Sequence, residues 1–301
     1  MNTMSMFRSK WLWLPLLFVT FGCFHSHQTI DAAEIKGDSQ LYLVSVGTGD
    51  PDNITIRAQT VIRDSQIIFC DQGIREKFAG MLQNKEIHDS GTGIHWIYGK
   101  SLEESRNQFD EVKKSRHFVY DEKMKEVDGI SSIIRKAINE GRTVSVLENG
   151  DPAIYGQNMW YMEAFADLKP EIVPGISSFN AANAVLKREV SAGKQRHSVI
   201  LTAPYVNSEL TGSDDIESLA ALHASMVLFT MRVDFQDVVA KLRKHYPSET
   251  PIAIVLHAGY RQKERIVQGT LSSINDELKK EGTLPFENLI YVGDFLTNRP
   301  Y

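Results

Sequence analysis

The sequence predicts an α/β protein of two α/β domains, the first built on a mostly parallel sheet and the second on a mixed sheet. Up to residue 187, short and almost wholly apolar runs alternate with amphipathic segments, which is typical of strands buried in a parallel sheet. Further along, two strands flank the polar residues 258–264, which indicates an antiparallel hairpin. The 301 residues, 42% of them apolar, are enough for two domains of ordinary size.

The N-terminal domain is expected to span residues 38–187. Its first strand, residues 41–46, runs into the turn at residues 47–51, and Asp52 or Asn53 is expected to cap the next helix. The apolar face of that helix consists of Ile54, Ala58, Val61 and Ile62. Other strands are expected at residues 66–70, 143–147 and 171–173, with helices at residues 102–114, 130–138, 157–165 and 179–186.

The C-terminal domain is expected to span residues 188–301. Strands are expected at residues 197–202, 225–230, 252–257, 265–269 and 288–292. Helices are expected at residues 215–222, 235–245 and 271–280. Because the strands at 252–257 and 265–269 form the hairpin, this second sheet must contain antiparallel pairs.

The first 33 residues differ in kind from the rest of the chain. Arg8 and Lys10 precede an uncharged run, residues 11–24, which is too short to span a bilayer comfortably. This pattern predicts a secretory signal peptide, with cleavage after Ala33 or lipidation of Cys23, and an uncleaved N-terminal membrane anchor is the alternative. We therefore expect an exported or membrane-anchored protein on the periplasmic side, while the anchor alternative leaves the cytoplasmic face open.

Charge and cysteine content exclude several classes of protein. The formal net charge is −5 and no long basic run occurs, so no nucleic-acid partner is expected. Cys23 and Cys70 are the only cysteines, which gives neither a disulfide framework nor a zinc site. His88, Asp89 and His95 fit no common pattern of metal ligands, and we expect no metal.

A glycine-bounded turn at residues 148–157 follows the expected strand 143–147 directly. Gly150 can take a positive φ, Asp151 offers a carboxylate at a strand end, and Pro152 fixes the direction of exit. Open α/β sheets bind ligands at this kind of position, although a plain strand-to-helix turn uses the same residues.

A second turn at residues 174–178 ends the expected strand 171–173. Ser177, Ser178 and the free N–H groups at the start of the next helix can bind carboxylate or hydroxyl groups of a ligand, or Ser177 only caps the helix. The glycine pair Gly47 and Gly49 does not complete a dinucleotide-binding fingerprint, because Asp52 stands where the third glycine is required.

Four separated segments together carry a resemblance to a known family. They are LVSVGTGDP at residues 43–51, GDPAIYG at 150–156, VPGISS at 173–178, and the hairpin at 251–271 that closes in IVQGTL. In their order and spacing the chain resembles the tetrapyrrole methylases, S-adenosylmethionine-dependent enzymes that include precorrin and cobalt-precorrin methyltransferases, uroporphyrinogen methyltransferase and diphthine synthase. The resemblance covers residues 40–295.

The resemblance implies a homodimer whose methyl donor, S-adenosyl-L-methionine, binds in a cleft between the two domains. The residues implied to contact the donor are Gly150, Asp151, Ile154, Tyr155, Ser177, Ser178, Met231 and Ala258. Of these, Asp151 and the serines suit its polar groups, whereas the apolar side chains suit adenine. Asp50 is the candidate catalytic residue for a step that deprotonates the acceptor or stabilises charge, and the alternative is that its loop only shapes the substrate mouth.

The expected function is methyl transfer to a tetrapyrrole. Thr48, where the family commonly has proline, and the long section 71–128 depart from the pattern in the region that meets the substrate. Two alternatives stay open: an exported or membrane-tethered binding protein of the same fold without turnover, and a family member that methylates a protein or RNA. A carboxylate-rich macrocycle requires Arg or Lys in the cleft, so such a lining is expected for the leading hypothesis.

Overall fold

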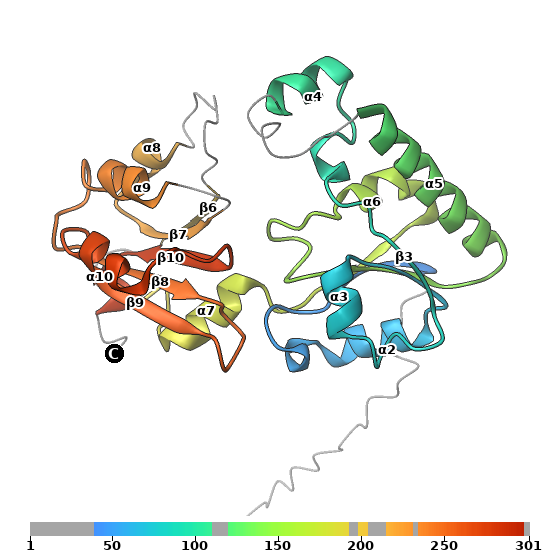
Figure 1. The fold of residues 1–301 in the computed structure, drawn as a ribbon, viewed down its shortest axis with the longest axis horizontal. Helices are drawn as coiled ribbons and strands as arrows, with labels where there is room; N and C mark the ends of the chain where they lie inside the picture. Colours follow the sequence, from blue (N-terminus) through green and yellow to red (C-terminus); the bar gives the residue numbers. More distant parts are fainter. Residues whose placement is uncertain (1–38, 110–119, 193–197, 204–214, 231–233, 298–301) are drawn as a thin grey trace, which may run out of the picture.

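The computed structural model describes residues 39–109, 120–192, 198–203, 215–230 and 234–297. Two lobes lie side by side, the N-terminal one in blue and green and the C-terminal one in orange and red (Figure 1). This arrangement confirms the prediction of two α/β lobes. The predicted signal segment, including Cys23, and the candidate donor contact Met231 lie outside the described residues.

The N-terminal sheet is parallel throughout its five described strands, in the order β3-β2-β4-β1-β5. Its strands are β1 (Leu41–Ser45), β2 (Ile67–Phe69), β3 (Glu86–His88), β4 (Val144–Glu148) and β5 (Glu171–Val173). The central pair, β1 and β4, is buried at every position. Such continuous burial explains why these strands appear in the sequence as unbroken apolar runs.

Helices cover both faces of this sheet and give it three layers. Helices α5 (Tyr120–Asn139) and α6 (Trp160–Ala164) pack against Leu41, Leu43, Val144 and Val146 on one face. Helices α2 (Ile56–Asp64) and α3 (Gln72–Lys77) pack against Tyr42, Val44 and Ile68 on the other. Alternate residues of each strand thus pack on opposite faces of the sheet. The remaining described elements of this lobe are η1 (Pro51–Asn53), η2 (Ile94–Trp96), α4 (Leu102–Phe109) and η4 (Ala166–Leu168).

The C-terminal sheet is mixed, as predicted, with the order β6-β7-β10-β8-β9. Only the pair β6–β7 is parallel among its described pairs, and β8–β9 is the expected hairpin. Its elements are β6 (Val199–Thr202), α8 (Ile216–Ala220), β7 (Ser225–Phe229), α9 (Phe235–Leu242), β8 (Pro251–Leu256), β9 (Arg265–Thr270), α10 (Ile274–Glu281), β10 (Asn288–Val292) and η5 (Asp294–Leu296). Helices α8, α9 and α10 cover one face.

Helix α7 (Ser178–Leu186) covers the other face of the C-terminal sheet. Its Ala181 and Ala182 pack in one cluster with Val227, Ala253 and Tyr291, and Figure 1 shows the helix beneath β8. The predicted division between residues 187 and 188 stays a prediction, but this packing favours a division before α7.

The cap of the first helix differs from the prediction. Asp52 and Asn53 belong to the short helix η1, and Thr55 caps α2 by accepting a hydrogen bond from the Ala58 N–H. The chain is extended at Ile54, which separates the two helices. Ile54 therefore lies outside α2, but all four residues of the predicted apolar face are buried.

Several other helices are shorter than predicted. Helix α6 begins at Trp160 rather than near residue 157, because the preceding turn continues through Asn158. Helix α9 ends at Leu242 and α10 begins at Ile274. Within the described residues, no helix is long and apolar enough to cross a membrane.

Candidate functional site

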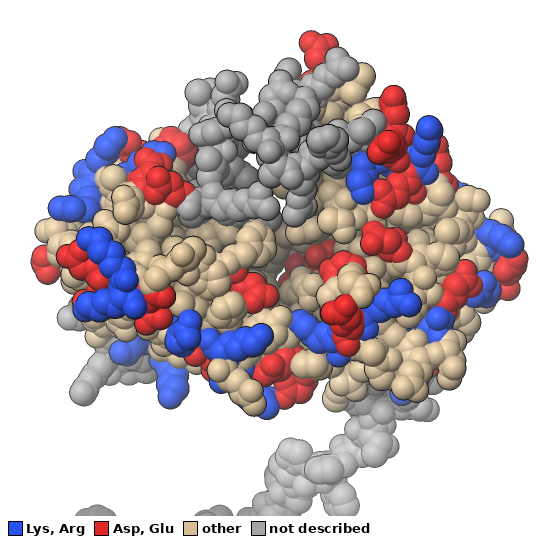
Figure 2. All heavy atoms as spheres, in the orientation of Figure 1, with Lys and Arg blue, Asp and Glu red and all other residues tan. Residues whose placement is uncertain are grey.

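A cleft of about 690 Å³ lies between the lobes, at the carboxyl ends of the parallel strands. Every strand of the N-terminal sheet leads into it, and the C-terminal lobe closes the opposite wall. The first wall includes Thr48, Gly49, Asp71, Lys77, residues 90–93, His95, Trp96, Lys100, residues 148–151, residues 154–158, Ser177 and Ser178. The second wall includes Phe229, Thr230, Ala258, Tyr260 and residues 286–289. Figure 2 shows the hollow where the two halves meet.

The turns after β1, β4 and β5 are held together around one buried hydroxyl. Ser45 Oγ donates to the Gly150 carbonyl and accepts from the Gly47 N–H at 3.1 Å. A Cβ added to Gly175 would lie 2.0 Å from the same oxygen. Gly150 N–H also donates to the Gly47 carbonyl at 2.9 Å. These contacts hold the ends of three strands together at the floor of the cleft.

The turn at residues 150–157 has the features that the sequence predicts for it. Gly150 has a φ of +74°, and an added Cβ would find its nearest atom 4.0 Å away, so space beside this backbone is open to a ligand. Asp151 Oδ1 accepts the Ala153 N–H at 2.8 Å. Gly156 packs so closely on Pro152 that an added Cβ would lie 2.2 Å from its carbonyl oxygen. Local geometry therefore requires both glycines and uses Asp151 to shape the turn.

Ser177 takes the capping role that was the alternative for it. Its hydroxyl accepts the Asn180 N–H at 3.3 Å and its backbone N–H donates to Asn180 Oδ1 at 3.2 Å, which forms a capping box at the start of α7. The hydroxyl also donates to Asn180 Oδ1 at 2.7 Å. Ser178 is only partly buried and lines the cleft. The first turn of α7 thus presents free N–H groups to the cleft while the Ser177 hydroxyl is already occupied.

The C-terminal wall combines apolar and polar side chains. Tyr155 of the N-terminal lobe reaches across to it, with its ring 4.7 Å from that of Phe229. Beneath this contact, the Thr230 hydroxyl lies 2.9 Å from the Asn288 carbonyl oxygen and 2.6 Å from its Oδ1. Ala258 lines the same wall. Of the eight predicted site residues that the structure describes, all except Asp50 thus line one cleft.

Asp50, the candidate catalytic residue, does not line the cleft. Its Oδ2 accepts the Arg261 N–H at 3.0 Å, and its own N–H donates to the Gly259 carbonyl at 2.9 Å. Asn53 Nδ2 reinforces this junction by donating to Thr48 and Gly259 carbonyls. The predicted catalytic role of Asp50 stays a prediction, while its contacts join the two lobes.

Two glycines meet backbone to backbone at this junction. Gly49 has a φ of +79° and Gly259 a φ of +86°, conformations that favour glycine. A Cβ added to Gly49 would lie 2.2 Å from the Gly259 carbonyl carbon. No larger residue fits at position 49 unless the lobes separate.

Charged groups in the described lining of the cleft are mainly acidic. The lining has four carboxyl groups, from Asp71, Glu148, Asp151 and Glu287, against the two lysines Lys77 and Lys100. Lys77 Nζ donates to the Gly49 carbonyl at 3.0 Å and to Tyr260 Oη at 3.1 Å. Burial, together with the nearby Lys100, lowers the pKa of His95 to about 4, so this ring is neutral at pH 7. The expected basic lining is therefore limited to two lysines and lacks arginine in the described residues.

Glu148 is a cleft residue to which the sequence assigned no role. It ends β4, is only 7% exposed, and its Oε2 accepts the Asn158 N–H at 2.9 Å. Burial raises the pKa of this carboxyl to about 7, and hydrogen bonds from Gln157 and Asn158 only partly oppose the rise. The signal that could have found it is a carboxylate that ends an otherwise apolar strand.

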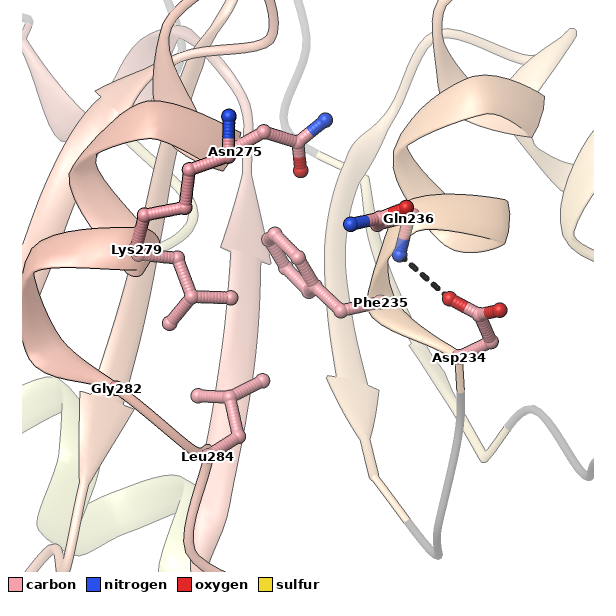
Figure 3. Close-up of a pocket in the computed structure, with 8 residues that line it drawn as sticks. Asp234, Phe235, Gln236, Asn275, Lys279, Gly282 and Leu284 are labelled. Carbon is pink, nitrogen blue, oxygen red and sulfur yellow. Dashed lines mark hydrogen bonds between the residues drawn. The ribbon is translucent and has the colours of Figure 1, made fainter.

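A second pocket, of about 450 Å³, lies between α9 and α10 (Figure 3). The ring of Phe235 points from the start of α9 toward α10, and Asp234 accepts the Gln236 N–H at 2.9 Å. Lys279 on its rim already pairs with Asp276. None of the predicted site residues that the structure describes lines this pocket, so the cleft between the lobes is the candidate site. Within the described chain, no cluster of three or more His, Cys, Asp or Glu side chains could hold a metal ion.

Comparisons with known proteins agree with this geometry. The family model of the tetrapyrrole (corrin/porphyrin) methylases matches residues 40–275. The cobalt-precorrin-4 C(11)-methyltransferase of Methanocaldococcus jannaschii is 30% identical, over 89% of this chain and 92% of that protein. The precorrin-4 C(11)-methyltransferase of Rhodococcus erythropolis is 26% identical, over 80% of this chain and 86% of that protein.

Solved structures share the fold. A cobalt precorrin-4 methyltransferase, described as a cobalamin biosynthetic enzyme, superposes with a TM-score of 0.65 at 22% identity, covering 89% of this chain and 98% of that one. The uroporphyrin-III C-methyltransferase of Thermus thermophilus, complexed with S-adenosyl homocysteine, superposes with a TM-score of 0.58 at 17% identity, covering 86% and 94%.

Fold and cleft together define a two-lobed α/β protein with a cleft between the lobes. The chain belongs to the tetrapyrrole (corrin/porphyrin) methylases. The resemblance carried by the four sequence segments is thereby confirmed, and so is the prediction of a methyltransferase at the level of the family.

Proposed function

We propose that this protein is an S-adenosylmethionine-dependent methyltransferase that methylates a carbon of a corrin-type tetrapyrrole. The observation that supports the proposal is that one cleft is lined by residues far apart in sequence. They come from the turns 150–157 and 174–178 and, in the second lobe, include Ala258. Relatives that match most of the chain are named for methyl transfer to precorrin-4 and cobalt-precorrin-4. These names favour a tetrapyrrole over a protein or RNA acceptor.

The residues of the cleft fit the proposed donor. Its volume lies within the range of roughly 300–1,000 Å³ that small-molecule sites occupy. The open backbone beside Gly150 and the N–H groups of α7 suit polar groups, and Ile154 and Ala258 offer apolar surface. Four carboxyl groups against two lysines also favour a cationic ligand. When bound, S-adenosylmethionine supplies a methyl group activated by the positive charge on its sulfur.

The protein's contribution to such a transfer is alignment and exclusion of water. The Ser45 hydroxyl and the glycines around it hold the first wall in place before any ligand arrives. Lys77 and Lys100 are the groups of the described lining that suit the carboxylates of the acceptor. The acceptor is proposed to be at the precorrin-4 stage, because the cobalt-precorrin-4 methyltransferase of Methanocaldococcus jannaschii is 30% identical to this chain, whereas the uroporphyrinogen-III methyltransferase of the same organism is 26% identical.

The test is calorimetric titration of the purified protein with S-adenosylmethionine, followed by methylation assays on cobalt-precorrin-4 and uroporphyrinogen III. We expect saturable binding that Asp151→Ala weakens by about tenfold or more, because the turn loses its internal hydrogen bond. Asp215→Ala is the matched control, since Asp215 Oδ1 accepts the Glu217 N–H at the same 2.8 Å outside the described cleft lining. Absence of binding by the wild-type protein would rule out the proposal.

Two further parts of the proposal concern assembly and location. We propose a homodimer, supported by the resemblance to the family, and light scattering of the purified protein tests it. Residues 1–33 are proposed to export or anchor the protein, as Arg8, Lys10 and the apolar run indicate. Protease accessibility in intact cells distinguishes the periplasmic from the cytoplasmic side, and mass spectrometry of the mature protein shows cleavage or lipidation at Cys23.

A further inference from the structure

Glu148 occupies an unusual place for a carboxyl group. It ends the central strand β4 and lies immediately before the turn at residues 149–157 that carries the proposed donor contacts. It is one of the residues that line the cleft, although it is only 7% exposed. A carboxyl group in such a position gives up hydration, which is costly when it is ionised.

No cation compensates for that cost among the described residues. The one charged side chain that shifts the Glu148 pKa is Asp71, which carries the same sign. The residues with titratable side chains around the same cleft are Asp71 and Lys77 after β2, His95 and Lys100 after β3, Asp151 and Tyr155 after β4, and Tyr260 and Glu287 on the opposite wall.

The other three acids of the cleft are more exposed and have identifiable structural partners. Asp71 caps α3 through the Ile74 N–H at 2.8 Å, and Asp151 accepts the Ala153 N–H. Glu287 is exposed and lies 2.8 Å from His257 Nδ1. Glu148 also accepts the Asn158 N–H, but a neutral glutamine would serve that bond equally well. The fold therefore needs an acceptor at position 148, not an acid.

Methyl transfer from a sulfonium donor to a neutral acceptor leaves one proton to remove. A bond forms between the acceptor carbon and the methyl group, while the sulfur–methyl bond breaks and its electron pair stays on sulfur. The acceptor takes up the positive charge and returns to neutrality by losing one proton. We propose that the Glu148 carboxylate accepts this proton and is the catalytic base of the cleft, an inference that rests on the proposed function.

The protonation behaviour of Glu148 agrees with this role. A general base acts best when its pKa lies near the working pH, and burial raises the pKa of Glu148 to about 7. Because Glu148 lies immediately before the turn of the proposed donor contacts, the sulfonium charge of a bound donor is expected to stabilise its ionised form and to displace a proton from it.

The first test counts protons on ligand binding and needs no acceptor. Calorimetric titrations at pH 7 in two buffers of different ionisation enthalpy compare S-adenosylmethionine with S-adenosylhomocysteine, whose sulfur is uncharged. We expect the wild-type protein to release up to about half a proton with the first ligand and little with the second. Glu148→Gln is expected to abolish the difference, while Glu163→Gln, an exposed acid on α6, keeps it.

The second test measures methylation of cobalt-precorrin-4. Glu148→Gln is expected to lower the rate about 100- to 10,000-fold while leaving the Kd for S-adenosylmethionine within about twofold. The wild-type rate is expected to rise with pH through about 7, and the variant to lose that rise. If Glu148→Gln keeps both the wild-type rate and the proton release, the inference is overturned. A wild-type protein that binds no donor overturns the proposed function instead, so the two failures are distinguishable.

Discussion

The N-terminal wall of the cleft consists of the ends of parallel strands, whereas the C-terminal wall consists of ends of antiparallel strands and the loops beside them. On the first wall, glycine turns packed around Ser45 hold Glu148 and Asp151 in place. On the second, Phe229 and Leu289 present apolar surface over the Thr230–Asn288 pair. Most of the polar side chains of the cleft thus lie on the first wall, whose backbone is more constrained, and the second wall adds apolar surface.

The junction between the walls is expected to be the most sensitive point. Gly49→Ala forces a Cβ into the Gly259 backbone at a positive φ, and we expect a loss of at least about 3 kcal/mol in the free energy of unfolding. Gly141→Ala is the control, because Gly141 has a φ of +75° but no atom within 4 Å of an added Cβ. That control is expected to cost about 1 kcal/mol in urea denaturation. Equal losses for the two variants would show that the walls do not depend on this contact.

The pH dependence of stability tests how much the buried Glu148 carboxyl destabilises the folded protein. Its pKa is about 7 in the folded protein against the ordinary 4.5, so the folded state binds more protons between these values. Stability therefore falls as pH rises from 4.5 to 7 and stays lower above 7. In urea denaturation, Glu148→Gln is expected to gain up to about 3 kcal/mol over the wild type between pH 5 and pH 8. If the difference in stability between Glu148→Gln and the wild type stays constant across this pH range, it contradicts a pKa of about 7 for Glu148.

The buried hydroxyls of Ser45 and Thr230, one on each wall, allow the contributions of the two walls to donor binding to be compared. Ser45→Ala removes the group that joins the Gly47 and Gly150 turns, and we expect a loss of about 2 kcal/mol in stability. Because those turns shape the proposed donor site, the Kd for S-adenosylmethionine is expected to rise about tenfold. Denaturation and calorimetry measure the two effects, and an unchanged Kd would show that the turns hold their geometry without the hydroxyl.

Thr230→Val is the counterpart on the C-terminal wall and is expected to have the smallest effect. It removes the hydroxyl that bonds Asn288 but keeps the side-chain shape, so we expect a loss of about 1 kcal/mol. The Kd for S-adenosylmethionine is expected to change less than about threefold. A larger effect on binding than that of Ser45→Ala would reverse the proposed division of roles.

Features governed by neighbouring residues could be predicted from the sequence. The apolar runs predicted the strands, and the turn at Gly150 follows from the conformations open to glycine and from the local reach of Asp151. The hairpin β8–β9 was predictable because a short polar turn leaves no room for a crossover.

Features that depend on distant contacts could not be predicted. Asn53 looked like a helix cap, but its side chain bonds Gly259, more than 200 residues away, and Thr55 caps the helix instead. The apolar face of α7 is visible in the sequence, yet nothing local shows that it packs on the second sheet. Likewise, Asp50 stands in a motif segment, and only the folded chain shows its carboxylate bonded to Arg261.

The contact between Gly49 and Gly259 also bears on the kinetics of ligand exchange. Two backbones in direct contact leave little room for the lobes to slide toward each other at that point, so rotation about it is the motion that remains. We therefore expect the cleft to open by rotation about this contact rather than by uniform widening. A ligand group far from Gly49 is then expected to leave sooner than one close to it, so that residence time depends on position along the cleft.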